Sequence, residues 1–256
     1  MSLSGSEIVL ITGASSGIGE ACAMKFASEG YNLIINARRK ERIDQLASKL
    51  ERDYKVKVKA LAFDVRDKES VIRQISTLSE EWSAIDILIN NAGLALGLSD
   101  IHEGDTHDWE QMIDTNVKGL LYVSKAVIPK MISRNKGQII NIGSIAAKET
   151  YLKGNVYCAT KHAVESLSKA MRMELLPYNI RVSLVNPGAV NTEFSQVRFK
   201  GDKDKAENVY KGYKPLSGED IAECIYFCVG LPEHVNINDM IVMPAAQATA
   251  TIFNKE

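Results

Sequence analysis

Short apolar runs rich in β-branched residues alternate with longer amphipathic stretches, and this alternation limits the possible folds more than any other feature of the chain. Seven runs are candidate strands: Ile8–Thr12, Leu33–Asn36, Val56–Ala62, Ile85–Asn90, Gln138–Ile142, Arg181–Val185 and Met240–Met243. Between them apolar residues recur at helical spacing, as at Ile43, Leu46 and Leu50. Strands that alternate with helices form βαβ units with right-handed crossovers. The pattern predicts an α/β fold, a doubly wound parallel sheet of seven strands with helices on both faces.

The length of 256 residues leaves room for one large domain or two small ones. No internal repeat, low-complexity tract or linker rich in Pro, Gly and Ser interrupts the alternation, so we expect a single domain over residues 1–256. The segment Pro187–Ser217 differs because it is long, polar and charged, and long loops in compact domains are usually lids or disordered segments. The sequence predicts a substrate lid at about residues 188–217.

Charge and hydropathy argue against several classes of partner. The chain has 31 Lys and Arg residues and 32 Asp and Glu residues, so its formal net charge is −1. Nucleic-acid binding selects a surplus of basic residues instead. No apolar run approaches the about 18 residues of a membrane-spanning helix, and Met1–Glu7 lacks the features of a signal peptide. We expect a cytoplasmic protein that binds neither nucleic acid nor membranes.

The four cysteines and four histidines match no metal or redox motif. Cys22 and Cys158 are isolated, whereas Cys224 and Cys228 lie one helical turn apart and are more simply explained as small buried residues. Unpaired thiols fit a reducing compartment. The sequence predicts no metal site.

The first candidate strand runs directly into a glycine-rich turn, Thr12-Gly13-Ala14-Ser15-Ser16-Gly17-Ile18-Gly19, which is followed by the helical pattern Glu20–Ser28. Backbone N–H groups and the positive end of a helix at such a turn can hold a pyrophosphate. The turn alone is a weak signal, because tight packing between a strand and a helix also selects small residues. Its place between the first strand and the first helix favours a Rossmann-like dinucleotide site.

The residues after the second strand indicate which dinucleotide would bind. Folds that bind NAD usually carry Asp or Glu there to hold the ribose 2′-hydroxyl, whereas a 2′-phosphate calls for Arg. Here Arg38 and Arg39 are followed by Lys40, with no acid at that place. A guanidinium suits phosphate because its planar fork donates two hydrogen bonds together. A solvated basic face would explain the same residues, but beside the glycine turn they favour NADP(H).

Tyr157 and Lys161 are four residues apart, so in a helix both side chains lie on one face. A tyrosine with an ordinary pKa of about 10 is a poor acid–base catalyst at neutral pH. A neighbouring ammonium group, together with the positive ring of an oxidised nicotinamide, favours the phenolate and lowers that pKa. The spacing is common in helices, so the pair needs support from other motifs.

That support comes from the order of motifs along the chain. The glycine turn is followed by Asp64-Val65, Asn90-Asn91-Ala92-Gly93, Asn116, Ser144, Tyr157-x-x-x-Lys161 and Pro187-Gly188. In the identity and the order of these motifs, the chain resembles the short-chain dehydrogenase/reductase family over essentially its whole length. Further segments resemble the NADP-dependent 3-hydroxy acid dehydrogenases, a subgroup also described as serine or allo-threonine dehydrogenases and malonic semialdehyde reductases. They include Gly154–Tyr157, Thr192–Ser195 and Val197–Asp202.

The resemblance implies roles for four catalytic residues. Tyr157 would be the general acid–base, and Lys161 would lower its pKa and hold the nicotinamide ribose. Ser144 would orient the substrate oxygen. Asn116 resembles the helix-interrupting Asn of the family that anchors a water leading to Lys161. Hydride transfer then needs the carbonyl carbon held against the nicotinamide ring while its oxygen is protonated.

The resemblance also implies the residues of the NADP(H) site and the assembly. Asp64 would recognise adenine, and Pro187, Gly188 and Thr192 would hold the carboxamide end of the nicotinamide. The expected cofactor-binding residues are Gly13, Ser15, Ser16, Gly17, Ile18, Gly19, Arg38, Arg39, Asp64, Val65, Asn91, Ala92, Gly93, Tyr157, Lys161, Pro187, Gly188, Val190 and Thr192. A homotetramer built on helices around Tyr157–Leu176 and Asp108–Ile132 is also implied.

The substrate class depends on fewer residues. A 3-hydroxy acid brings a carboxylate, which calls for Arg or Lys near Ser144 and Tyr157. Arg198 in the expected lid is the leading candidate, ahead of Lys153 and Lys200, although a charge run on a mobile loop can simply be solvated.

Three functions stay open from the sequence. The first is an NADP(H)-dependent oxidoreductase that interconverts a short 3-hydroxy acid and its carbonyl form. The second is an NADPH-dependent reductase of another carbonyl, such as a 3-ketoacyl thioester or a diketone. The third is a protein that senses NADP(H) without turnover, which an intact set of four catalytic residues disfavours.

Overall fold

The apolar runs of the sequence become the inner strands of a sheet that is covered on both faces. The computed structural model describes residues 7–256. All five residues of the first strand are buried, as expected when helices pack on both sides of a parallel sheet. The strands are β1 (Ile8–Thr12), β2 (Asn32–Ala37), β3 (Val58–Ala62), β4 (Ile85–Asn90), β5 (Gly137–Ile142), β6 (Ile180–Pro187) and β7 (Asp239–Val242).

Helices follow the strands as the alternation predicts. The α-helices are α1 (Gly17–Ser28), α2 (Lys40–Tyr54), α3 (Lys68–Ser76), α4 (Glu80–Ser83), α5 (Thr106–Ile113), α6 (Leu120–Arg134), α7 (Asn155–Leu175), α8 (Glu193–Arg198), α9 (Lys203–Asn208) and α10 (Gly218–Val229). A π-helical segment η1 (Asp114–Gly119) joins α5 to α6, and η2 (Ile145–Ala147) and η3 (Leu176–Tyr178) are 3₁₀ turns.

The strand order is β3-β2-β1-β4-β5-β6-β7, and all neighbouring strands are parallel. The chain winds outward from β1 to β3, returns to β4 and then winds outward in the other direction. The predicted doubly wound parallel sheet is confirmed, and because the described strands all join one sheet, we keep the interpretation of a single domain. In such folds ligands bind beyond the carboxyl ends of the strands, where the winding reverses.

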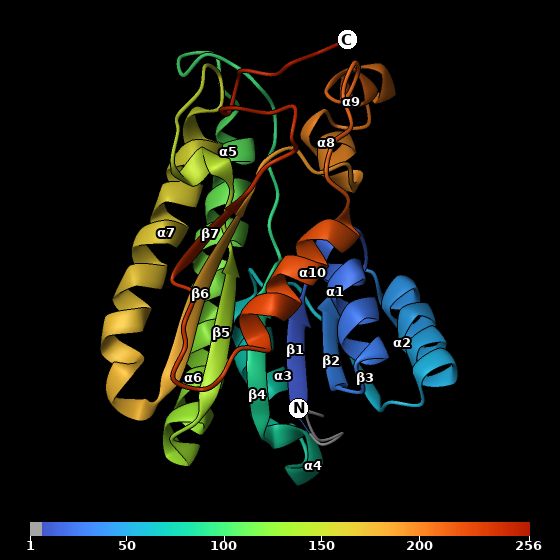
Figure 1. Cartoon of the computed structure of the whole chain (residues 1–256), viewed down its shortest axis with the longest axis vertical. Coiled ribbons are helices and arrows are strands. Elements are labelled where there is room, and N and C mark those ends of the chain that lie inside the picture. The colour runs from blue at the N-terminus through green and yellow to red at the C-terminus, as the bar shows by residue number, and fades with distance from the viewer. Residues whose placement is uncertain (1–6) are drawn as a thin grey trace.

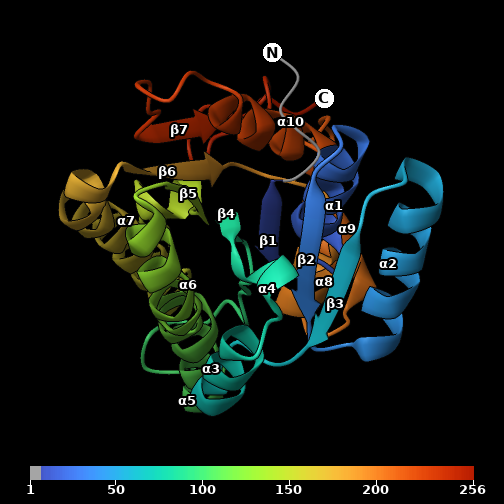
Figure 2. The ribbon, with the colours of Figure 1, turned by 90° about the horizontal axis from the view of Figure 1, so that it is seen from below.

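Two helical layers cover the sheet because successive side chains of a strand point to opposite faces. Val9 and Ile11 pack with buried residues of α1, α2 and α10, whereas Ile8 and Leu10 pack with buried residues of α3, α6 and α7. Figure 2 shows these two sets of helices on either side of the sheet. Figure 1 shows α8 and α9 beyond one end of the strands, close to the start of α1.

The helix expected over Asp108–Ile132 is not continuous. The backbone changes from α-helical to π-helical at Asp114 and back at Leu120, with Asn116 buried inside the π-helical turn. The Asn116 amide exchanges two hydrogen bonds of 2.8 Å with the backbone of Leu94. An extra residue in the turn is typical of π-bulges, which are often found at functional sites.

The expected lid is more ordered than the long polar loop that the sequence suggested. Residues 188–217 contain the short helices α8 and α9, because polar side chains cap both. The Thr192 hydroxyl accepts a hydrogen bond from Phe194 N at 3.2 Å, and the Asp202 carboxylate accepts one from Lys205 N at 3.1 Å. Periodicity could not find these helices since each has only six residues.

The carboxyl-terminal segment 244–256 packs against the lid. Gln247 is buried and its Oε1 accepts a hydrogen bond from Ala189 N at 2.8 Å. The rings of Phe253 and Tyr213 lie 4.9 Å apart. In the described part of the chain, no helix has the length and hydropathy needed to cross a bilayer. The prediction that Met1–Glu7 is no signal peptide concerns mostly residues 1–6, which lie outside the described residues.

Candidate active site

A cleft of about 320 Å³ lies where the winding of the sheet reverses. Its walls come from the β1–α1 turn, from the ends of β2, β4, β5 and β6, from α7 and from the start of α8. The residues that line it are Gly13, Ser15, Ser16, Gly17, Ile18, Asn36, Ala37, Arg38, Arg39, Phe63, Asp64, Val65, Asn91, Ala92, Gly93, Leu94, Thr115, Ile142, Gly143, Ser144, Tyr157, Lys161, Pro187, Gly188, Val190, Thr192, Glu193, Phe194 and Val197.

The glycine turn needs its glycines for conformation and for close approach. Gly13 and Gly17 have φ of +68° and +58°, which other residues rarely adopt. A Cβ on Gly19 would lie 2.3 Å from Gly13 O, so any side chain there would push α1 away from the turn. Gly19 is not among the residues that line the cleft, and this close approach gives a packing reason for glycine there, while its expected cofactor contact stays a prediction.

Side chains from β1 and β4 hold the turn in place. The Thr12 hydroxyl accepts hydrogen bonds from the backbone N–H groups of Asn91 and Ala92, both at 3.0 Å. The Asn91 amide in turn donates to the carbonyls of Thr12 and Gly13. These hydrogen bonds fix the turn to the residues that follow β4, while the other side of the turn faces the cleft.

Basic residues from the end of β2 and the start of α2 flank the glycine turn. The Arg39 guanidinium donates to the hydroxyls of Ser15 at 3.1 Å and Ser16 at 3.3 Å. Arg38 is 3.9 Å from Asp64, whose carboxylate is also paired with Arg66 at 2.7 Å. Burial would raise the pKa of Asp64, but hydrogen bonds from Arg66 outweigh it and hold the pKa below its usual value.

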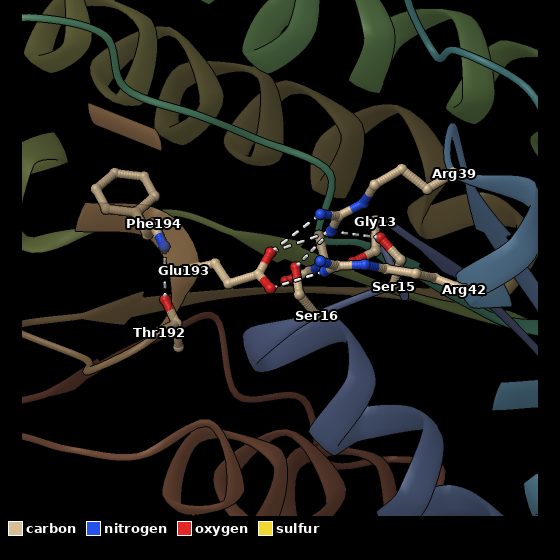
Figure 3. A network of polar contacts seen from close by, with 9 residues as sticks. Gly13, Ser15, Ser16, Arg39, Arg42, Thr192, Glu193 and Phe194 are labelled. Atoms are coloured by element: carbon tan, nitrogen blue, oxygen red, sulfur yellow. Dashed lines mark hydrogen bonds and ion pairs between the residues drawn. The ribbon is translucent and has the colours of Figure 1, made fainter. Parts of the chain in front are cut away.

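One acid joins these arginines from the lid. Glu193, the first residue of α8, accepts hydrogen bonds from Arg39 at 3.1 and 3.2 Å and from Arg42 at 2.7 Å. Figure 3 shows its carboxylate facing both guanidinium groups, with Ser15 and Ser16 beside that of Arg39. The sequence contained Glu193 in a segment of subgroup resemblance but gave no reason to pair it with residues 151 and 154 positions earlier.

Tyr157 and Lys161 project from α7 toward the ends of β4 and β5, as the helical spacing predicted. Lys161 Nζ donates to Ile142 O at 2.9 Å and lies 6.0 Å from the centroid of the Tyr157 ring. Both residues are only 7% exposed. Phe194 covers the tyrosine from the lid, with the two rings 5.7 Å apart.

Among the groups of the protein, burial has the largest effect on the pKa of Tyr157. Burial raises the pKa of its phenol above the ordinary value, and although the side chains of Ser144 and Arg198 oppose that shift, they do not reverse it. Burial also lowers the pKa of Lys161 to about 8. The groups of the protein alone therefore keep Tyr157 protonated at neutral pH.

Ser144 is fixed at the end of β5 by a neighbouring strand. Its backbone N–H donates to Asn186 Oδ1 at 3.0 Å, and its hydroxyl accepts from Ala146 N at 3.1 Å. A Cβ on Gly143 would come within 1.9 Å of Asn186 Oδ1, so the approach of Asn186 requires glycine there. Asn186 was not among the residues that the sequence analysis selected.

Asn116 stands behind the cleft rather than in its lining. Besides its two bonds with Leu94, its amide donates to Thr160 Oγ1 at 3.0 Å. The side chain thereby ties the loop after β4 to α7 at Thr160, the residue before Lys161. These contacts explain Asn116 as a positioning residue and leave its expected water contact as a prediction.

Arg198, at the end of α8, contacts Tyr157 and lines, with it, a small pocket beside the cleft. Its guanidinium lies 5.5 Å from the ring centroids of both Tyr151 and Tyr157, and Nη2 donates to the Tyr151 hydroxyl at 2.9 Å. Its Nε is buried without a hydrogen-bond partner. Within residues 7–256 no ion pair joins Arg198 to a carboxylate.

The other candidate cations are already neutralised. Lys153 pairs with Asp100 at 3.6 Å, and Lys200 pairs with Asp108 at 2.9 Å. Several lining residues had no signal of their own in the sequence, because the fold brings them to the cleft from separate elements and loops: Phe63, Leu94, Thr115, Ile142, Gly143, Phe194 and Val197. In the part of the chain from residue 7 onward, no group of three or more His, Cys, Asp and Glu residues is placed to hold a metal ion.

Comparison with known proteins gives consistent matches. The family described as short chain dehydrogenase matches residues 7–203. The NADP-dependent 3-hydroxy acid dehydrogenase YdfG of Shigella flexneri is 45% identical over 244 residues, which are 95% of this chain and 97% of that protein. An NADP-dependent 3-hydroxy acid dehydrogenase of Schizosaccharomyces pombe is 46% identical over 250 residues, covering 97% of this chain and 96% of the relative.

The solved structures agree. A closed form of serine dehydrogenase complexed with NADP⁺ superposes with a TM-score of 0.92 at 44% identity, over 97% of this chain and 99% of that one. A serine dehydrogenase from Escherichia coli gives a TM-score of 0.81 at 39% identity, over 94% of this chain and 99% of its own. With a family match over most of its length and relatives of this similarity, the chain belongs to the short chain dehydrogenase family.

Proposed function

We propose that this protein interconverts a short 3-hydroxy acid and its carbonyl form by hydride transfer with NADP(H). The coarser statement, an NADP-dependent oxidoreductase, follows from the family and from relatives whose names give that activity. The acids that we propose are of the serine, allo-threonine, 3-hydroxypropionate or 3-hydroxyisobutyrate type.

One observation carries the choice of an acid as substrate. The Arg198 guanidinium lies 5.5 Å from the Tyr157 ring, has no carboxylate partner in the described chain and keeps a buried Nε without a partner. A buried donor without a partner is costly. A substrate carboxylate would satisfy it with a charge-assisted hydrogen bond while the substrate oxygen faces Tyr157.

The residues present also fit NADP(H). Gly13 and Gly17 form a turn of positive φ whose exposed side faces the cleft at the start of α1, which suits a pyrophosphate. Arg38 and Arg39 line the same cleft beside Ser15 and can hold a 2′-phosphate. When bound, the dinucleotide supplies or accepts the hydride.

The other steps belong to side chains of this chain. Tyr157, kept protonated by burial, donates its proton to the substrate oxygen during reduction and accepts it during oxidation. Ser144, held by Asn186, orients that oxygen. Lys161, anchored on Ile142 O, places a positive charge beside the phenol while it is itself protonated, below a pKa of about 8.

The test is a panel of substrates with NADP⁺: L-allo-threonine, serine, 3-hydroxyisobutyrate and 3-hydroxypropionate, each followed by the absorbance of NADPH. Methyl esters of the last two are matched controls without a carboxylate. We expect turnover of at least one acid and a much lower kcat/KM for its ester. Turnover of none of the four, or equal use of acid and ester, would contradict the proposal and favour another carbonyl substrate.

We further propose a homotetramer. Exposed apolar residues on the helices expected to form it, Leu121 on α6, Met173 on α7 and Leu176 directly after α7, support the proposal. Light scattering combined with size-exclusion chromatography would give the mass, and a monomer mass would contradict it. The cytoplasmic location stays a prediction.

A further inference from the structure

Glu193 lies on the arginines that face the cleft, in a place where an acid is unexpected. Its carboxylate accepts hydrogen bonds from Arg39 and Arg42, and Arg39 also donates to Ser15 and Ser16. Two guanidinium groups around one anion, with two hydroxyls beside one of them, resemble the donor sets that bind a phosphate. Figure 3 shows the carboxylate of Glu193, from the lid, facing the guanidinium groups of Arg39 and Arg42.

The pairing is between charged groups. Partial burial would raise the pKa of Glu193, but hydrogen bonds from Arg42 and Arg39 outweigh this and hold it below its usual value. Glu193 is therefore ionised at neutral pH, and it uses N–H donors of Arg39 on both Nη1 and Nη2.

We propose that Glu193 is an internal competitor of the cofactor's 2′-phosphate, so that NADP(H) binding displaces its carboxylate from Arg39. The inference rests on the proposed use of NADP(H). A phosphomonoester carries between one and two negative charges at neutral pH, so it repels the glutamate and outcompetes it for the guanidinium. A dinucleotide without that phosphate gains nothing from displacing Glu193, which makes the residue a determinant of cofactor affinity and selectivity.

The position of Glu193 gives the competition a second consequence. Glu193 opens α8, with Thr192 before it and Phe194 after it, and the Phe194 ring packs 5.7 Å from the ring of Tyr157. The pairing of Glu193 with α2 thus joins the lid to the adenosine end of the cleft. Its release leaves the start of α8 free to adjust over Tyr157.

The test measures equilibrium binding by calorimetry rather than turnover. Adenosine 2′,5′-bisphosphate is the probe that carries the 2′-phosphate, and 5′-AMP is the probe that lacks it. Glu193→Gln keeps the shape and removes the charge. We expect it to bind the bisphosphate about tenfold more tightly than the wild type, a change of about 1.4 kcal/mol, and 5′-AMP with a change below about twofold.

Glu41→Gln is the matched control, because Glu41 lies on α2 beside Arg42, is exposed and makes no side-chain hydrogen bond or ion pair in the described chain. It should change neither affinity by more than about twofold, as expected of an exposed charge. If Glu193→Gln leaves the bisphosphate affinity unchanged or weakens it, or tightens both probes equally, the competition is wrong.

Binding of NADPH to the wild-type protein distinguishes a failure of the role proposed for Glu193 from a failure of the proposed cofactor. If NADPH binds while the substitution has no selective effect, only the role of Glu193 fails. If neither NADPH nor the bisphosphate binds the wild-type protein, the proposed cofactor itself fails, and the role of Glu193 fails with it.

Discussion

The guanidinium of Arg198 lies 5.5 Å from the centroid of the Tyr157 ring, and the ammonium nitrogen of Lys161 lies 6.0 Å from the same centroid. One tyrosine is thus flanked by two cations from different parts of the chain. Only Lys161 is anchored on the backbone of the sheet, through Ile142 O, whereas Arg198 belongs to the lid.

Arg198→Gln should remove the partner of the substrate carboxylate. We expect kcat/KM for the preferred 3-hydroxy acid to fall roughly 100-fold, the effect of losing one partner of a buried charge pair, with a much smaller loss for its methyl ester. Lys153→Gln, which removes a cation already paired with Asp100, is the control and should cost less than about threefold. Equal losses on acid and ester in the Arg198 variant would show that Arg198 acts on Tyr157 and not on a carboxylate.

Tyr157→Phe should remove the proton donor and leave the walls of the cleft intact. We expect kcat to fall at least ~100-fold, the low end for general acid–base catalysis, while the Kd for NADPH stays within about threefold. Steady-state kinetics and fluorescence titration measure the two quantities. Near-normal turnover would exclude Tyr157 as the acid–base.

Arg38→Asp should weaken NADPH binding selectively. Arg38 lines the cleft, is more than half exposed and lies 3.9 Å from Asp64, so the substitution gathers negative charge where a phosphate would bind. We expect the Kd for NADPH to rise at least about tenfold and that for NADH to change less than about threefold. Arg52→Asp, on the last turn of α2, is the control for a charge reversal away from the cleft. Equal affinities of the wild type for the two dinucleotides would already contradict the argument.

Lys161 should give stability a distinctive pH dependence. Its folded-state pKa is about 8, whereas an unfolded lysine titrates near about 10.4. Between these two pKa values the unfolded chain binds more protons than the folded chain. Burying the charged ammonium therefore destabilises the folded protein fully below pH 8, and this destabilisation decreases as the pH rises. Relative to Lys161→Met, the free energy of unfolding of the wild type should rise by up to about 3 kcal/mol from pH 7 to pH 10.

Urea unfolding of both proteins at several pH values measures that difference. Other lysines cancel, because both proteins carry them. A difference that stays constant with pH, or that changes in the opposite direction, would mean that burial does not lower the pKa of Lys161.

The fold was predictable because its signals are local. Apolar runs of four to seven residues mark strands, and Ile8–Thr12 and Ile85–Asn90 were placed without error. Strand ends were less certain, since Val56 and Lys57 continue the alternation of apolar and charged residues while the first parallel pair of that strand is Val58 with Leu33. Two six-residue helices in the lid were missed because they depend on capping by Thr192 and Asp202 rather than on periodicity.

The site was predictable only in part. Residues within one motif, such as Gly13 and Gly17 or Tyr157 and Lys161, have a fixed spacing along the chain, and this spacing predicts how they lie relative to each other. The partnerships of Glu193 with Arg39 and of Asn186 with Ser144 join residues 154 and 42 positions apart, and they depend on how the lid and strands meet. The effect of burial on the Tyr157 pKa was missed for a similar reason, because burial is a property of the whole fold.

The carboxyl-terminal segment 244–256 supports the lid and the wall of the cleft. Gln247 Oε1 supports Ala189 N, next to the cleft residue Gly188, and Glu256 N donates to Gly212 O in the lid at 2.9 Å. Gln247 therefore supports the wall of the cleft although it is not among the residues that line it. Gln247→Ala should change the kinetic constants, with the larger change in KM.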